Sequence, residues 1–149
     1  MTDYASLATR LERELSQEPP GEPALRRAVE LLKSNLPDYT WVGIYRLEGD
    51  TLVLGPFIGK PSPHTRIPIG QGICGAAAAA RDTIVVHDVN ADPRYLACSL
   101  ETKSEIVVPI LREGEVLGEI DIDSDRRAAF GRGDRELLER VAAILAQKI

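Results

Sequence analysis

Apolar residues recur three and four positions apart near both ends of the chain, a spacing typical of helices that pack one face on a core. Residues 3–16 predict a first helix, which the proline- and glycine-containing stretch 17–21 interrupts. A second helix is expected before Leu36, and Asp134 is expected to cap a C-terminal one. The apolar positions are Leu7, Leu11 and Leu15; Leu25, Ala28, Val29, Leu31 and Leu32; and Leu137, Leu138, Val141, Ile144 and Leu145.

The middle of the chain has extended runs of apolar and β-branched residues that predict strands. Two pairs of these runs are joined by three-residue polar turns, Glu-Gly-Asp and Arg-Glu-Gly, and each pair predicts a β-hairpin. An alanine-rich helix is expected over residues 73–81. The expected strands are residues 39–47, 51–58, 66–69, 83–87, 104–111 and 115–123.

This order of elements predicts an α+β fold. Hairpins join antiparallel strands, so the central sheet should be mostly antiparallel, with the N- and C-terminal helices on one face. The other face is left for the alanine-rich helix, the irregular segment 88–103 and a ligand pocket that they enclose. We expect a single domain over residues 1–149, with the N-terminal helices in 1–36 and the sheet core and C-terminal helix in 39–149.

Charge and composition exclude several classes of partner. The net charge is −5 and no cluster of lysine and arginine occurs, so nucleic acid is not expected as a partner. No apolar run approaches the roughly 20 residues needed to span a bilayer, and the N-terminus lacks a signal-peptide pattern, so no membrane contact is expected. We expect a cytoplasmic protein, in which Cys74 and Cys98 are free or catalytic and not a structural disulfide.

A row of acidic residues alternates with isoleucine over residues 118–123, which places Glu119, Asp121 and Asp123 on one face of a strand. One interpretation is a solvated sheet face, where water screens the like charges. The other is a binding patch, joined by Glu105 from the partner strand, that suits an ammonium group or a metal ion. No histidine or cysteine lies in the row, so a zinc or iron site is not expected.

The two cysteines are the second candidate site. Cys74 opens the alanine-rich helix, where the helix dipole would favour the thiolate, although a buried packing residue is the alternative. Cys98 lies in a loop, away from any periodic apolar face. Two thiols near a carboxylate patch suggest a redox pair. His64 and His87 are interpreted as structural residues.

Trp41 and Tyr45 stand four apart on one face of the first predicted strand. They would form either an aromatic wall for an apolar ligand group or ordinary core packing.

From Thr40 onward the chain resembles the GAF-domain free methionine-R-sulfoxide reductases. The resemblance covers about three quarters of the chain. It rests on Trp41–Tyr45, Leu52–Phe57, Gly59–Lys60, Arg66–Gly70, Gly72–Gly75, Ala97–Cys98, Ser104–Pro109 and Gly118–Ser124.

The resemblance implies an oxidoreductase that acts on free methionine sulfoxide and has no bound cofactor or metal. The cysteine matching Cys98 would attack the sulfoxide sulfur and become a sulfenic acid, and a disulfide with a second cysteine would then be reduced by thioredoxin as external reductant. The residues matching Glu105, Asp121 and Asp123 would belong to the substrate site, and that matching Trp41 would wall the methyl group.

One position departs from the family pattern. His64 stands where the family usually has a first cysteine. This leaves Cys74 as the resolving thiol within the chain, unless an external thiol serves or the two cysteines exchange roles.

A non-catalytic GAF domain that binds a small molecule as a sensor is the alternative function. A cyclic nucleotide is a poorer fit because an acidic pocket repels phosphate. The N-terminal helices could pair two subunits as a homodimer.

Overall fold

The computed structural model describes residues 2–96 and 100–149. Its six strands form one sheet in the order β3-β2-β1-β6-β5-β4, and every neighbouring pair is antiparallel. The strands are β1 (Trp41–Glu48), β2 (Thr51–Ile58), β3 (Arg66–Pro68), β4 (Ile84–Val86), β5 (Ser104–Arg112) and β6 (Glu115–Ser124). The helices are α1 (Tyr4–Ser16), α2 (Glu22–Asn35), α3 (Gly72–Ala80) and α4 (Arg132–Leu145), with a short 3₁₀ turn η1 (Val89–Ala91).

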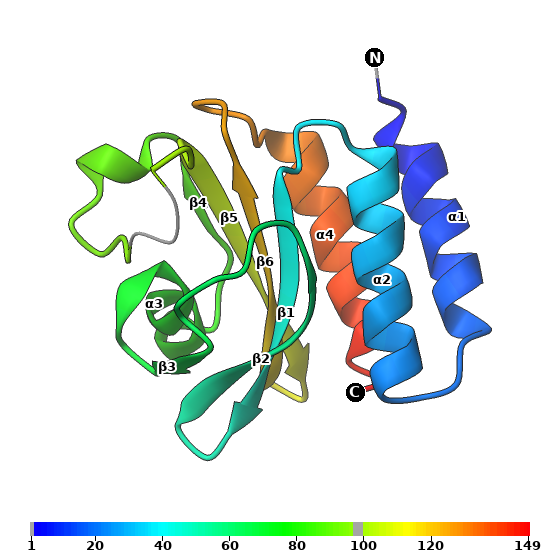
Figure 1. Ribbon diagram of the computed structural model, residues 1–149. Helices are drawn as coiled ribbons and strands as arrows, with labels where there is room; N and C mark the ends of the chain where they lie inside the picture. Colours follow the sequence, from blue (N-terminus) through cyan, green and yellow to red (C-terminus); the bar gives the residue numbers. More distant parts are fainter. Residues whose placement is uncertain (1, 97–99) are drawn as a thin grey trace.

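The sheet separates two layers (Figure 1). Helices α2 and α4 cover one face, and α1 packs on them from outside. On the other face lie α3 and the segment that carries η1. The expected α+β arrangement, with the terminal helices on one face and the middle helix on the other, is therefore confirmed.

The alternation of side chains along β5 and β6 explains this division. Ile106, Val108, Ile120 and Ile122 point into the large apolar core beneath the helices and are completely or almost completely buried. The intervening residues point to the α3 side, where a smaller core contains Val107. The two hairpins, β1–β2 and β5–β6, form where the turns predicted them.

The start of α4 differs from the expectation. Gly131 is the N-cap residue, and Asp134 lies one turn inside the helix, where its side chain accepts a hydrogen bond from the backbone N–H of Gly131 (2.9 Å). The buried carboxylate also accepts a 2.7 Å hydrogen bond from the Tyr39 hydroxyl. Asp134 was expected as the cap itself; it instead closes the cap from inside and ties α4 to the segment before β1.

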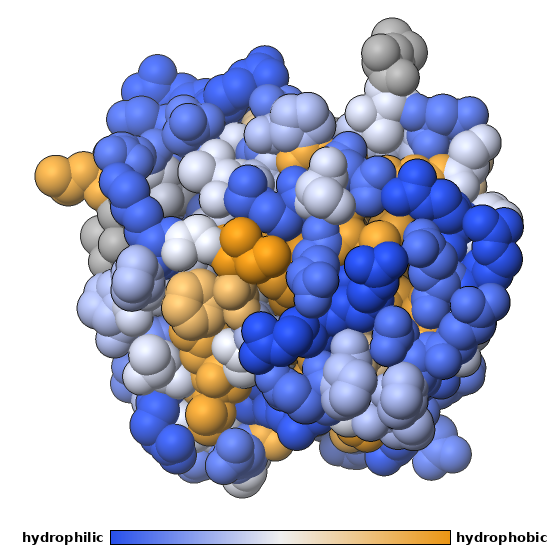
Figure 2. Space-filling view, turned by 45° about the vertical axis from the view of Figure 1, so that its right-hand side comes forward, coloured by the Kyte–Doolittle hydropathy of each residue, from blue (hydrophilic) through white to orange (hydrophobic). Residues whose placement is uncertain are grey.

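The helical side of the molecule is largely hydrophilic at its surface, as Figure 2 shows, with smaller apolar patches between the polar residues. Among the described residues, no helix combines the length and apolar character that crossing a membrane requires.

Candidate functional site

The acidic row of β6 is buried, not solvated. Glu119, Asp121 and Asp123 are 0%, 3% and 4% exposed, and Glu105 of β5 is also buried. Glu105 pairs directly with Asp123 across the β5–β6 ladder, so both strands contribute to one patch. The structure therefore excludes the solvated-face interpretation and brings the four carboxylates together beneath α3.

Helix α3 places a thiol over this patch. The Sγ atom of Cys74 and one carboxylate oxygen each of Glu105 and Asp121 all lie within 4.8 Å of one another. A small residue makes this close approach feasible, because a Cβ atom added at Gly75 would lie 2.6 Å from the carbonyl oxygen of Pro68. The start of α3 can therefore sit directly against β3 and the sheet.

The environment of Cys74 reverses the expectation drawn from its helix position. Burial raises the pKa of the Cys74 thiol well above its usual range, and the charges of Asp121 and Glu105 raise it further. The helix dipole was expected to favour a thiolate, but desolvation and like charge dominate. The packing interpretation is correct as to burial, and Cys74 holds its proton in the resting protein.

The carboxyl groups are shifted in the same direction. Burial raises the pKa of Asp121, and it raises those of Glu119 and Asp123 well above the usual range. Interaction with Glu105 and with the Cys74 thiol partly opposes this shift at Asp121. One oxygen of Asp121, one of Asp123 and both of Glu119 have no hydrogen-bond partner among the described residues. The patch thus combines several acids that retain protons with acceptor atoms left for a ligand.

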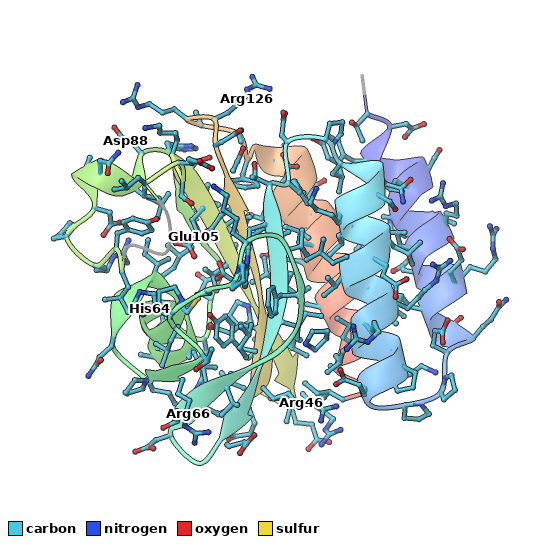
Figure 3. All side chains as sticks on the ribbon, in the orientation of Figure 1. Arg46, His64, Arg66, Asp88, Glu105 and Arg126 are labelled. Atoms are coloured by element: carbon cyan, nitrogen blue, oxygen red, sulfur yellow. The ribbon has the colours of Figure 1, made fainter. Side chains whose placement is uncertain are left out.

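A small cavity of about 20 Å³ opens beside the thiol. Its polar lining comes from Cys74, Glu105, Asp121, Tyr45 and His64. The Tyr45 hydroxyl donates a 2.8 Å hydrogen bond to the backbone oxygen of His64, which fastens the loop before β3 over the cavity. Figure 3 shows His64 and Glu105 on the side of the sheet that carries α3.

His64 lines this cavity, a position that the sequence interpretation did not predict. It was read as structural because no ligand-like neighbour lies near it in sequence, and its partners come instead from β1, α3, β5 and β6. The sequence did offer one indication, because His64 occupies the position at which the resembling family usually has a cysteine. His87, by contrast, is exposed and lies outside the cavity lining.

A second cavity, of about 280 Å³, is lined in part by Trp41 and Asp123. The Trp41 indole N–H donates a 2.9 Å hydrogen bond to the Lys60 carbonyl oxygen, and its ring stacks on Phe57 with centroids 5.7 Å apart. The Lys60 ammonium forms a 2.8 Å ion pair with Glu101 at the rim. The Trp41 ring is therefore held in place by Phe57 and the Lys60 backbone while it borders the larger cavity.

The predicted site residues are thus divided between two neighbouring cavities. Cys74, Tyr45, Glu105 and Asp121 line the smaller one, while Trp41 and Asp123 line the larger. The aromatic residues Tyr45 and Trp41 lie on β1, and the acidic residues Asp121 and Asp123 lie on the neighbouring strand β6. Trp41 pairs directly with Asp123 in this ladder. Cys98 lies outside the described residues.

The same residues bear on whether a cofactor is needed. Of the described residues, Cys74, Glu105 and Asp121 are the His, Cys, Asp and Glu side chains that approach one another closely enough to be considered for a metal ion. Two of these three side chains are carboxyl groups, which can accept either a metal ion or an organic ammonium group. An organic ammonium group suits the patch as its cation.

Comparison with known proteins gives the family. The GAF domain model matches residues 20–149. The free methionine-R-sulfoxide reductase of Saccharomyces cerevisiae is 45% identical over 117 residues, which are 76% of this chain and 64% of the yeast protein. The Escherichia coli protein of the same name is 41% identical over 123 residues, 78% of this chain and 72% of its own.

A solved structure agrees with these relatives. The X-ray structure of free methionine-R-sulfoxide reductase from Neisseria meningitidis, in complex with its substrate, is 37% identical and superimposes with a TM-score of 0.91. The match covers 97% of this chain and 87% of that one. The chain therefore belongs to the GAF domain family and, within it, to the group that contains the free methionine-R-sulfoxide reductases.

Proposed function

We propose that this protein reduces free L-methionine-R-sulfoxide to methionine with its cysteine thiols. The observation that carries the proposal is the buried carboxylate patch of Glu105, Asp121 and Asp123 beside the Cys74 thiol, with the Trp41 ring at its edge. The names of the yeast and E. coli relatives and the substrate-bound Neisseria structure support the same activity.

The unpartnered carboxyl oxygens of the patch favour a free amino acid as substrate. A free amino acid carries an ammonium group, whereas a methionine sulfoxide residue within a peptide does not. Buried carboxylate oxygens without a hydrogen-bond partner gain most from such a cation, because no water competes for it. The indole of Trp41 offers an apolar surface for the methyl group on sulfur.

The reaction uses one thiol at a time. The Cys98 sulfur attacks the sulfoxide sulfur and takes over its oxygen as a sulfenic acid, so that the substrate sulfur is reduced to the sulfide of methionine. A protonated carboxyl group such as that of Asp121, whose pKa is raised by burial, supplies the proton to that oxygen. The Cys74 thiol then displaces the oxygen as water and forms a disulfide with Cys98, which two electrons from thioredoxin reduce in the cytoplasm.

Turnover with two single-cysteine variants tests this assignment. We expect wild-type protein to convert free L-methionine-R-sulfoxide with dithiothreitol, and Cys98→Ser to abolish the single-turnover burst of methionine. Cys74→Ser should retain the burst and lose turnover driven by thioredoxin, because the sulfenic acid then has no resolving thiol in the chain. The S epimer and a peptide that contains methionine sulfoxide serve as substrate controls.

Two outcomes would overturn the proposal. A wild-type protein without a burst would favour a GAF domain that binds a small molecule without chemistry. A burst that survives Cys98→Ser but is lost in Cys74→Ser would exchange the roles of the two cysteines.

A further inference from the structure

Glu119 is a buried acid that the proposed reaction does not use. It is 0% exposed, and neither of its carboxylate oxygens meets a hydrogen-bond donor among the described residues. An ionised carboxylate in such a place loses its hydration without compensation, whereas a protonated one does not. Asp134 shows the contrast, since it is also buried but accepts hydrogen bonds from Tyr39 and Gly131.

Among the residues that the structure describes, the titratable neighbours of Glu119 belong to the site. Asp121 follows it on the same face of β6, and the Cys74 thiol faces both carboxyl groups from α3. On β1 its cross-strand partner is Tyr45, and on β5 it is the uncharged Pro109, with Glu105 reaching the patch further along that strand. Burial raises the pKa of Glu119 well above its usual range and the charge of Asp121 raises it further, while interaction with the Cys74 thiol opposes part of this shift.

Glu119 has no direct access to the ligand spaces. It belongs to the lining of neither cavity, whereas its neighbours Asp121 and Cys74 both line the small one. Among the described residues, the neighbours of Glu119 that reach the small cavity are therefore Asp121, Cys74 and the cross-strand residue Tyr45. Glu119 differs in this respect from Glu105, Asp121 and Asp123, each of which lines one of the two cavities.

We propose that Glu119 is a positioning residue that holds a proton in the resting protein and shares it with Asp121, so that Asp121 remains able to donate into the small cavity. Two adjacent carboxyl groups cannot both ionise readily, and the pair therefore keeps one proton to a higher pH than Asp121 would alone. The identity of the final acceptor, a sulfoxide oxygen, rests on the proposed function.

The protons balance over one reaction cycle. Asp121 gives the shared proton to the sulfoxide oxygen as the Cys98 thiolate takes that oxygen, which leaves the Glu119–Asp121 pair without a proton. When the disulfide forms, the Cys74 thiol proton passes through the pair to the oxygen, which leaves as water. Reduction of the disulfide by a dithiol returns one proton to Cys74 and one to Asp121.

Infrared spectroscopy tests the protonated state without any need for activity. We expect the wild-type protein at neutral pH to show the carbonyl stretch of protonated carboxyl groups, and Glu119→Gln to lose the part that comes from the Glu119–Asp121 pair while the part from Asp123 remains. Glu115→Gln, at an exposed position of the same strand, is the matched control and should leave that band unchanged. A wild-type spectrum without such a band at neutral pH overturns the proposal, even if the Glu119 variant fails to fold.

The pH profile tests the coupling to Asp121. Without the second carboxyl group, Asp121 loses its proton more readily, so the alkaline limb of kcat/KM should move to lower pH by about one unit in Glu119→Gln, about a tenfold loss on that limb. If Glu119→Gln turns over substrate and its alkaline limb does not move, this inference is overturned, whereas the proposed reductase activity is not. Absence of turnover with the infrared band present would instead overturn the proposed function.

Discussion

Replacing Gly43 with alanine tests whether Trp41 is held in one position for substrate. Gly43 lies on β1 and pairs with Asp121 of β6. A Cβ atom built there would lie 2.3 Å from Cη2 and 2.6 Å from Cζ3 of the Trp41 ring. Carbon atoms in contact normally stay about 3.5–4.0 Å apart, so the ring would have to move by more than about 1 Å.

The expected cost follows from what the indole would give up. Forcing a methyl group into a packed site costs about 1–3 kcal/mol, and loss of the Trp41 hydrogen bond to the Lys60 carbonyl oxygen adds about 1 kcal/mol. The stacking on Phe57 would weaken as well. We therefore expect Gly43→Ala to be destabilised by about 2–4 kcal/mol and to bind methionine sulfoxide more weakly.

Intrinsic fluorescence provides a direct assay, because Trp41 is the only tryptophan of the chain. The emission should shift towards that of a more exposed indole, and KM should rise more than kcat falls. Gly131→Ala is the matched control, since nothing lies within 4 Å of a Cβ atom there. Unchanged fluorescence and unchanged KM in Gly43→Ala would refute the idea that the ring position matters.

Two further predictions concern stability. Tyr39→Phe removes the 2.7 Å hydrogen bond to the buried Asp134 carboxylate, and urea unfolding should show a loss of about 2 kcal/mol with the Met-R-sulfoxide KM unchanged. The folded-state pKa values of Glu119, Asp121 and Asp123 are raised, so their stabilising contribution is complete below the unfolded value near 4 and is lost as pH rises through the folded values. Calorimetry should therefore show Tm falling from mildly acidic towards alkaline pH, and a Tm that rises over this range would contradict the buried, protonated state.

The layered fold could be predicted because its determinants are local. The β1–β2 and β5–β6 hairpins depend on short polar turns between strands that adjoin in sequence, and alternation along β6 assigns each residue to a face. The N-terminus of α4 was misplaced for an equally local reason. An aspartate before an apolar run suits both the cap and the third helical position, and Gly131 offers no side chain to mark the true cap.

The site was harder to predict because its properties come from contacts between distant segments. His64 and Cys74 line one cavity only because Tyr45 fastens the loop before β3 and because Gly75 allows α3 to approach that strand. The sign of the Cys74 pKa shift also depends on burial of the thiol against four carboxyl groups. A helix position alone indicates the dipole, which here is the weaker effect.

The acidic row of β6 shows why sequence reasoning left two interpretations open. Repulsion between like charges forbids a row of ionised carboxylates in an apolar interior, and that argument favours the solvated face. It does not apply to carboxyl groups that keep their protons, and protonation depends on burial, which the alternating pattern does not reveal. Because the opposite face of the same strand buries Ile120 and Ile122 completely, the apolar core on that side fixes the strand in place and allows the acidic side chains to be enclosed under α3. The patch is therefore buried because the strand that carries it is central to the sheet, and its acids retain protons that they would lose to water at any edge strand.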